Sequence, residues 1–126
     1  MVLRGDIYYG DLGKRSGSVQ SGIRPLLVIQ NDVGNAHSPT YIVAPLTSNV
    51  KKGYLPTHVL IDKSLSKLQE DSFVLFEQIT TIDKKNLKEY VSHIDDEHLA
   101  KIDKAICVSL GLKYIKFDSD IIVHNS

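Results

Sequence analysis

Short runs of apolar residues, separated by segments rich in glycine and polar residues, occupy most of the chain. Runs of this length bounded by turn-forming residues are typical of β-strands. They predict six strands, which span Asp6 to Asp11, Pro25 to Gln30, Tyr41 to Leu46, Thr57 to Ile61, Phe73 to Ile82 and Glu89 to His93. Six short strands in one small chain indicate a small β-barrel.

A single helix is predicted after the last strand. Four apolar residues recur there at helical spacing and would form one stripe: Leu99, Ile102, Ile106 and Leu110. Asp95 is a good N-cap, the two acidic residues after it suit the positive end of a helix, and Gly111 can end the helix. The stripe is expected to pack on the barrel, so the fold class is mainly β with a C-terminal α-helix.

The connection between the first two strands is longer than a hairpin requires and carries glycines at positions 10, 13, 17 and 22. Long loops of this kind tend to be functional, so we expect residues 10–22 to cover a bound ligand. The loop is not a Walker loop, because Asp11 stands where that motif requires lysine. Later in the chain, Asp118 to Val123 either adds an edge strand or remains disordered.

Length and composition describe one soluble domain. The chain has 126 residues, of which 42% are hydrophobic and 24% charged, which is enough for one core of moderate size. No apolar run approaches the roughly 18 residues of a membrane span, and the start of the chain lacks an apolar signal core. We therefore expect a cytoplasmic protein that is not embedded in a membrane. The single cysteine, Cys107, cannot form an intramolecular disulfide.

Basic and acidic residues are equal in number over the whole chain, but they are distributed unevenly along the sequence. The formal net charge is zero, which argues against a general nucleic-acid coat protein. Residues 12–61 nevertheless hold five basic residues against one acidic residue, whereas residues 62–126 hold nine lysines and twelve acidic residues. A basic half is compatible with RNA lying along one face, because phosphate binding depends on local clusters of charge.

Arg24 is the most informative residue, because it stands between a polar, glycine-spaced loop and a short apolar strand. Its planar, permanently charged guanidinium suits phosphate, and Pro25 fixes the chain beside it. A second apolar strand ends at Thr47, and antiparallel pairing of the two strands would make Arg24 and Thr47 neighbours. A guanidinium beside a hydroxyl can clamp a phosphodiester. Taken singly, each residue also fits an ordinary strand end.

Metal or cofactor chemistry is not indicated by the sequence. His93 and His98 are five residues apart, which would turn them roughly 140° from each other on a helix, whereas chelation favours a spacing of four. The acidic run that begins at Asp95 is typical of a helix cap. There is neither a Gly-x-Ser-x-Gly motif nor a cysteine near a loop mouth. We expect no metal and no cofactor.

Six short segments stand out together: Arg4 to Tyr8, Gly22 to Pro25, Val28 to Asp32, Ala44 to Ser48, Leu55 to Val59 and Glu77 to Lys84. In this order and spacing they resemble the MazF/PemK family of messenger-RNA interferase toxins, over residues 3–112. The resemblance implies a small SH3-like β-barrel (CcdB/PemK-like), a homodimer, and cleavage of single-stranded messenger RNA. It also implies inhibition by a co-expressed antitoxin. We expect the extended surface of the dimer to attract an acidic, disordered segment of that antitoxin, which folds as it binds.

The resemblance also assigns parts of the chain. Residues 1–112 would form the endoribonuclease domain, and residues 113–126 an extension of unknown role. The motif positions that match Arg24 and Thr47 carry catalysis in that family. Val19 is a departure, because many members have an acidic residue at its position, and this puts the RNA contacts of the loop in question.

In the chemistry that these residues would support, the 2′-hydroxyl of the RNA attacks the adjacent phosphate and leaves a 2′,3′-cyclic phosphate and a 5′-hydroxyl. Arg24 would stabilise the developing charge, and Thr47 would donate to a phosphate oxygen or orient the nucleophile. An arginine is a poor general base, so the proton acceptor stays open, with His58 and Glu77 as fallback candidates.

RNA bases would be read by polar side chains around the cleft and stacked on aromatic rings. The candidates for reading are Ser18, Gln20, Asn31, Ser48, Lys51, Ser72 and Gln78, and those for stacking are Tyr8, Tyr9, Tyr41 and Tyr54. Two alternatives to a ribonuclease remain. One is a non-catalytic toxin on the same barrel, such as the related gyrase poisons, although their tryptophan-containing end has no counterpart here. The other is an RNA-binding module that does not cleave.

Overall fold

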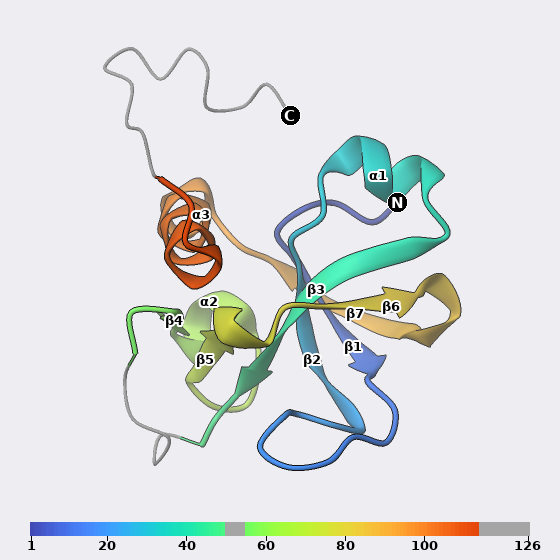
Figure 1. Ribbon diagram of the computed structural model, residues 1–126, viewed down its shortest axis with the longest axis horizontal. Helices are drawn as coiled ribbons and strands as arrows, with labels where there is room; N and C mark the ends of the chain where they lie inside the picture. The colour runs from blue at the N-terminus through green and yellow to red at the C-terminus, as the bar shows by residue number, and fades with distance from the viewer. Residues whose placement is uncertain (50–54, 114–126) are drawn as a thin grey trace.

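The computed structural model describes residues 1–49 and 55–113, which are built around one antiparallel sheet (Figure 1). The sheet within these residues has seven strands: β1 (Asp6–Asp11), β2 (Ile23–Val28), β3 (Thr40–Thr47), β4 (His58–Ile61), β5 (Ser72–Leu75), β6 (Thr80–Asp83) and β7 (Leu87–His93). Neighbouring strands follow the order β4-β5-β3-β2-β1-β7, and β6 also pairs with β3. The prediction of a mainly β protein is confirmed, but the sheet does not close, so "barrel" describes it only loosely.

Strand β3 is the centre of the sheet because it has a different partner along each half. Its first half pairs with β6, where Tyr41 faces Ile82, and its last residues pair with β5, where Leu46 faces Val74. Along its other edge β3 pairs with β2, where Leu27 faces Ala44. The sheet therefore divides at β3 into a part that ends with β4 and a part that ends with β7 (Figure 1).

The prediction of one continuous strand from Phe73 to Ile82 was wrong. The chain leaves β5 through a 3₁₀ turn, η2 (Phe76–Gln78), before it forms β6. Phe76 is 1% exposed and packs in the main core, and burying a ring of this size favours the turn over a straight strand. The turn also lets β5 and β6 pair with opposite halves of β3.

Three short helices were not predicted: α1 (Asp32–His37), α2 (Lys63–Ser66) and the 3₁₀ turn η3 (Lys84–Asn86). All three are too short to show a helical repeat of apolar residues, but each begins at a side-chain cap. Asn31 Oδ1 accepts from the Gly34 N–H at 2.8 Å and starts α1. Asp62 and Asp83 accept the corresponding hydrogen bonds in α2 and η3.

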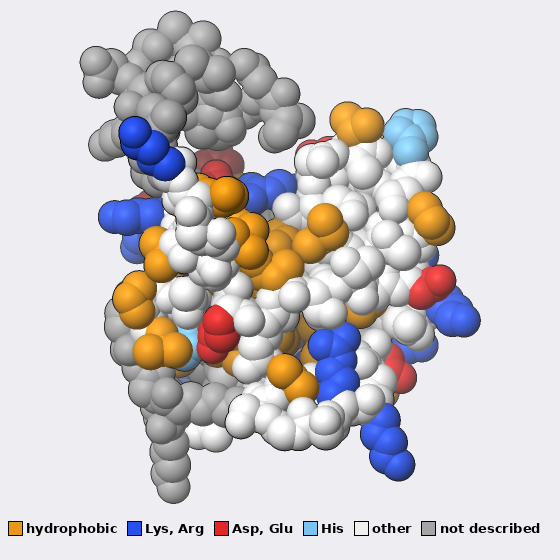
Figure 2. Space-filling model, in the orientation of Figure 1, with side chains coloured by type: hydrophobic (Ala, Val, Ile, Leu, Met, Phe, Trp, Pro, Cys, Tyr) orange, Lys and Arg blue, Asp and Glu red, His pale blue; other side chains and the backbone are white. Residues whose placement is uncertain are grey.

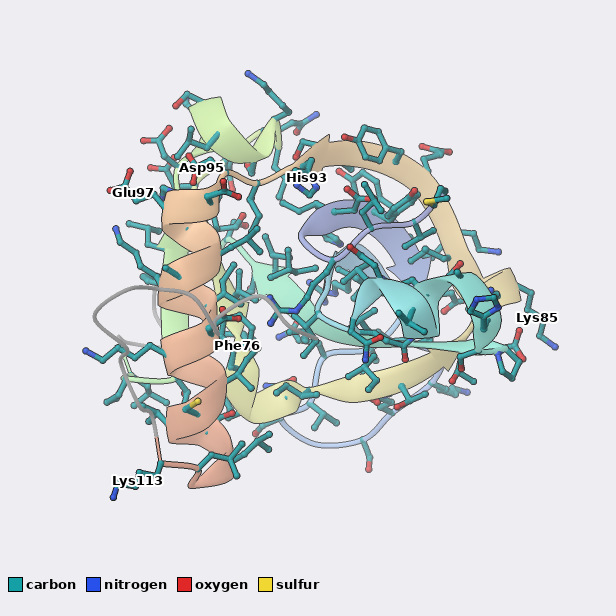
Figure 3. All side chains as sticks on the ribbon, turned by 90° about the horizontal axis from the view of Figure 1, so that it is seen from above. Phe76, Lys85, His93, Asp95, Glu97 and Lys113 are labelled. Carbon is teal, nitrogen blue, oxygen red and sulfur yellow. The ribbon has the colours of Figure 1, made fainter. Side chains whose placement is uncertain are left out.

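The C-terminal helix is α3 (Asp96–Leu110), and its predicted boundaries are confirmed. Asp95 Oδ1 accepts from the His98 N–H at 2.8 Å, and Gly111 ends the helix in the left-handed conformation with φ 70°. Asp95 and Phe76 are labelled in Figure 3, where Phe76 lies between α3 and the sheet. Leu110 does not belong to the buried stripe, because it is 58% exposed. The buried face is centred between Ile102 and Ala105, and Leu110 is turned roughly 110° from that direction.

Both faces of the central strands are covered by apolar side chains. On one face Leu27 and Ala44 join the core that Phe76 and Ile102 complete under α3. On the other face Leu26 and Val43 pack in a second cluster with Leu12. This double burial explains why β2 is a continuous apolar run, and it fixes the register that brings the ends of β2 and β3 together. Among the described residues, no helix combines the length and apolar character that a membrane crossing would need.

Candidate active site

Arg24 and Thr47 lie at the adjoining ends of β2 and β3. Leu26 pairs with Pro45 in this antiparallel ladder, so continuing the register by two residues places Arg24 opposite Thr47. Both residues line one pocket of about 190 Å³. The adjacency that the strand pairing predicted is therefore present in the structure.

The guanidinium of Arg24 is exposed and makes one hydrogen bond among the described residues. Its Nε donates to the carbonyl oxygen of Ser21 at 3.1 Å. The terminal nitrogens contact no acceptor in the described part of the chain, so their donors are available to an anion such as phosphate.

Thr47 is 6% exposed and also lines the pocket. Its Oγ1 accepts from the Asn49 N–H at 3.2 Å. Because a hydroxyl has one proton and two lone pairs, this contact leaves the Thr47 proton available to donate. A charged fork and a hydroxyl donor thus converge on the same volume.

Further polar side chains surround this pair. Ser48 and Ser72 line the pocket as candidates for reading RNA, and Ser72 Oγ donates to the carbonyl oxygen of Glu70 at 3.1 Å. Sequence reasoning did not include Gln69 and Glu70, which also line the pocket. They follow α2, and since that short helix was not predicted, nothing in the sequence showed that its exit would reach Arg24.

Tyr9 is the aromatic residue of the pocket among the described residues. The other tyrosines proposed for stacking have different positions. Tyr41 is 7% exposed and belongs to the second core cluster, where the Lys84 ammonium lies 5.4 Å from its ring centroid. Tyr8 packs edge to face on Tyr90, with 5.4 Å between ring centroids. Tyr54 lies outside the described residues.

Three of the proposed RNA-reading residues do not line the pocket, and they contact one another where η2 meets the loop between β1 and β2. The Gln20 N–H donates to Gln78 Oε1 at 2.8 Å, and Gln78 Nε2 donates to the Ser18 carbonyl oxygen at 3.4 Å. Gln20 is 7% exposed, and its own Oε1 is buried without a partner among the described residues. These contacts hold the loop against η2.

Two other proposed residues are not brought to the pocket by the described structure. Asn31 follows the opposite end of β2 from Arg24 and is the N-cap of α1. Lys51 lies outside the described residues. The segment from Asp118 to Val123, for which an edge strand or disorder was predicted, also lies outside them.

The fallback proton acceptors form a pair of their own beside α3. His58 Nε2 lies 2.9 Å from Glu77 Oε2, and His58 is 2% exposed. Neither residue lines the pocket of Arg24 and Thr47. Burial acts to raise the pKa of Glu77, but hydrogen bonds from His58, from the Glu77 backbone and from Thr57 outweigh it and leave that pKa below its ordinary value.

Other ionisable groups occur as pairs in the described part of the chain. His93 Nδ1 lies 2.7 Å from Asp6 Oδ1, and His98 Nδ1 lies 2.8 Å from Asp95 Oδ1. His93 and Asp95 are labelled near the start of α3 in Figure 3. Among the described residues, no three His, Cys, Asp or Glu side chains come close enough together to hold a metal ion.

Comparison with known proteins gives the same family as the six segments. The family described as PemK-like, MazF-like toxin of type II toxin-antitoxin systems matches residues 3–110. Endoribonuclease EndoA of Bacillus subtilis (strain 168) is 51% identical over 112 residues, which are 89% of this chain and 97% of that protein. The chain therefore belongs to the PemK-like, MazF-like toxin family. Together the family and this relative indicate an endoribonuclease.

Solved structures agree with the fold. An endoribonuclease in complex with its cognate antitoxin, from Mycobacterial species, has a TM-score of 0.76 at 28% identity and covers 91% of this chain and 100% of its own. The MazF toxin of Deinococcus radiodurans has a TM-score of 0.74 at 23% identity and covers 88% of this chain and 97% of its own. The arrangement of strands and of α3 is thus the one found in MazF toxins.

The pair of His58 and Glu77 leads to a prediction about pH and stability. Because the folded-state pKa of Glu77 is lowered, its stabilising effect is present above the unfolded value near 4.5 and is lost as the pH falls through the lower folded value. At pH 7 the free energy of unfolding in urea should be larger for the wild-type protein than for Glu77→Gln. This difference in unfolding free energy should disappear below about pH 4.5. Glu89→Gln, on the exposed side of β7, controls for removal of a surface carboxylate. A gap that stays constant from pH 7 to pH 3 would contradict the prediction.

Proposed function

We propose that the protein is a sequence-specific, metal-independent endoribonuclease toxin that cleaves single-stranded messenger RNA. The observation that carries the proposal is the pocket lined by both Arg24 and Thr47, where the terminal nitrogens of Arg24 and the hydroxyl proton of Thr47 have no acceptor among the described residues. Membership of the toxin family and the 51% identity to an endoribonuclease support the substrate class. The domain responsible spans residues 1–112, and residues 113–126 form an extension.

In the proposed reaction the substrate supplies its own nucleophile. The 2′-hydroxyl attacks the adjacent phosphorus, the bond to the 5′-oxygen of the next nucleotide breaks, and that oxygen leaves with a proton. The products carry a 2′,3′-cyclic phosphate and a 5′-hydroxyl. Arg24 binds the non-bridging oxygens, where negative charge develops, and the Thr47 hydroxyl donates to a phosphate oxygen or orients the nucleophile.

The proton acceptor for the 2′-hydroxyl is not His58 or Glu77 in this proposal, because these two residues bind each other outside the pocket. Among the described residues that line the pocket, Glu70 is the one carboxylate. Glu70 and solvent are therefore the acceptors that the described pocket offers.

Specificity for particular bases would come from the polar rim of the pocket. Ser48 and Ser72 offer hydroxyl groups in the pocket, and Tyr9 offers a ring for stacking. Ser18 would add a hydroxyl from the loop between β1 and β2, outside the pocket lining. Gln20 and Gln78 act on the loop that carries Ser18, through their hydrogen bond to each other. Lys51 would add positive charge along the path of the RNA.

We propose that the toxin is a homodimer formed through β4 and α3. A groove of about 490 Å³ lies between these elements and is lined by Pro56, His58, Val59, Leu60, Lys101, Lys104, Ala105 and Val108. Leu60 and Val108 are each 48% exposed, and hydrophobic side chains gather over α3 and β4 in Figure 2. Strand β4 is also an edge of the sheet, and an uncovered apolar edge is typical of an interface. A two-fold axis there would join two pockets into a longer RNA surface.

The natural inhibitor in this proposal is an antitoxin with an acidic, disordered segment. One structural relative, at 28% identity, was solved with its cognate antitoxin. Arg24 and the excess of basic residues in residues 12–61 would attract such a segment, which folds as it binds. A non-catalytic toxin of the gyrase-poison kind is less favoured, because the chain has no tryptophan.

Substitution of the two central residues tests the proposal. Arg24→Ala and Thr47→Ala should each lower cleavage of a long RNA by roughly 10²-fold or more, because each removes a donor aimed at the developing charge. Growth arrest on expression should disappear with them. Thr81→Ala, on the exposed side of β6, is the matched control and should cleave like wild type. Wild-type cleavage by purified Arg24→Ala would refute the assigned role.

The source of the nucleophile gives a second test. Cleavage should continue in excess EDTA and should stop when the cut site carries a single 2′-deoxy sugar, because the attacking group then no longer exists. Mapping the fragment ends should find a cyclic phosphate and a 5′-hydroxyl. Activity that is lost in EDTA, returns with magnesium and extends to the deoxy substrate would show that the mechanism is wrong even for an active ribonuclease.

The proposed dimer gives a third test. Leu60→Glu or Val108→Glu would place a charge in the apolar interface, so sedimentation at micromolar concentration should change from the mass of two chains to that of one, 14.1 kDa. Val33→Glu adds the same charge at an exposed position of α1 and should leave the dimer intact. A wild-type protein that sediments as a single chain would rule out this interface.

A further inference from the structure

We propose that Glu70 is the general base that accepts the proton of the attacking 2′-hydroxyl. The proposal rests on the function proposed above and decides between the two acceptors, Glu70 and solvent, that the described pocket offers. It adds to Arg24 and Thr47 a third residue that touches the reacting atoms, and this residue was not among the candidates that the sequence gave.

Glu70 reaches the pocket from the side of Thr47 that lies opposite Arg24. Strand β3 lies between β2 and β5, so Thr47 has Arg24 on one flank and β5 on the other (Figure 1). Thr47 pairs with Phe73 in β5, and Glu70 stands three residues before Phe73. All three polar residues, Arg24, Thr47 and Glu70, line the same pocket. A cation and a carboxylate therefore flank one hydroxyl.

The pocket is small, so groups on its wall can reach the same part of a substrate. Its volume of about 190 Å³ is below the roughly 300–1,000 Å³ of pockets that enclose whole small molecules. The 2′-hydroxyl belongs to the ribose that is bonded to the reacting phosphate, so a phosphate held by Arg24 brings this hydroxyl to the pocket. A general base must come within hydrogen-bond distance of the proton, and this contact often tightens only when the substrate binds.

The Glu70 carboxylate is available to accept a proton. It is exposed and takes part in none of the ion pairs or side-chain hydrogen bonds of the described residues, so it does not neutralise Arg24. Apart from Arg24, the other described residues of the pocket lining are neutral. A positioned general base contributes roughly 10²–10⁴-fold, and water is a weaker base than a carboxylate. Glu70 is therefore the stronger of the two acceptors.

The backbone before Glu70 is fixed by the exit from α2. Ser66 is fully buried, and its carbonyl oxygen accepts a hydrogen bond from the Ser92 hydroxyl of β7. Lys67 then ends α2 in the left-handed conformation, with φ 66°, and Leu68 packs against the main core. Residues other than glycine adopt this conformation mainly where surrounding contacts impose it. The exit from α2 thus carries the next two residues to the pocket wall.

The backbone after Glu70 is fixed as well. The Ser72 hydroxyl donates to the Glu70 carbonyl oxygen at 3.1 Å. Asp71 Oδ1 accepts from the N–H of Lys63, the first residue of α2, at 2.8 Å. With the backbone held on both sides, the carboxylate is limited to the positions that its own rotamers allow. A base that acts at one defined distance needs such a restriction.

In the proposed step Glu70 takes the proton of the 2′-hydroxyl as the bond between the 2′-oxygen and phosphorus forms. The electron pair of the broken bond stays on the 5′-oxygen, which takes a proton from water. Glu70 then gives its proton to the hydroxide that remains, so the carboxylate and the water are both restored. Arg24 stabilises the charge on the non-bridging oxygens throughout.

Separate measurements of cleavage and binding test this role. Glu70→Gln keeps the size of the side chain but loses its basicity, so the single-turnover rate constant at saturating protein should fall about 10²-fold. Its Kd for RNA with a 2′-deoxy sugar at the cut site should stay the same or fall, because a negative charge near the phosphates is lost. Glu89→Gln removes an exposed carboxylate of β7, which does not line the pocket, and should cleave like wild type.

Chemical rescue distinguishes a lost base from a disturbed pocket. Glu70→Ala should cleave as slowly as Glu70→Gln, and formate, a small carboxylate, should raise its rate constant about tenfold by taking the place of the missing base. Chloride at the same ionic strength should give no increase. Arg24→Ala should not respond to formate, because this variant still contains Glu70.

Two results would overturn the proposal. One is a rate constant for Glu70→Gln within about threefold of wild type, which would make solvent the acceptor. The other is a slow Glu70→Ala that formate stimulates no more than chloride does, which would give Glu70 a structural role. Failure of the proposed function is recognised from wild type alone: it would cut the 2′-deoxy RNA, or no RNA, and the assignment of a base would fail with it. The two results above instead require a wild type that needs the 2′-hydroxyl.

Discussion

The pairing of β2 with β3 is the constraint on which the rest of the structure depends. Leu26 and Leu27 point to opposite faces, and each enters a separate apolar cluster. A slip of the register by one residue would exchange the two sets of side chains and lose both clusters, so the alignment of β2 on β3 is strongly fixed. That same alignment places Arg24 beside Thr47. The geometry of the pocket is thus set by packing at some distance from it.

The fold carries this pairing on a sheet that changes partners at β3. The turn at Phe76 buries an aromatic ring under α3 and sends the chain from one half of β3 to the other. Gln78, two residues later, then faces the loop between β1 and β2. One buried ring therefore connects the core under α3 to the loop that borders Arg24. Stability of the core and order of the loop are linked through this turn.

Much of this arrangement could be predicted from sequence because it depends on local patterns. Apolar runs gave the strands, the Asp95 cap and Gly111 gave the ends of α3, and antiparallel pairing gave the adjacency of Arg24 and Thr47. What could not be predicted depends on tertiary contacts. The strand is interrupted at Phe76 because the ring of that residue packs in the core. The approach of Glu70 to the pocket depends on the short helix α2. The separation of His58 from the pocket likewise follows from its place on the edge strand β4.

The three arginines show why residue type alone does not identify a phosphate site. Arg4 Nη2 lies 2.6 Å from Asp103 Oδ1, so its charge is compensated within the protein and serves to join α3 to the sheet. Arg15 donates to a carbonyl oxygen and to Thr80, and so it serves the loop. Arg24 is held by the Ser21 carbonyl alone among the described residues. A neutral acceptor orients the guanidinium without cancelling its charge, whereas a carboxylate partner would compete with phosphate for the same donors. The full positive charge of Arg24 is therefore available in the pocket that it shares with Thr47, which is where we propose that the RNA backbone binds.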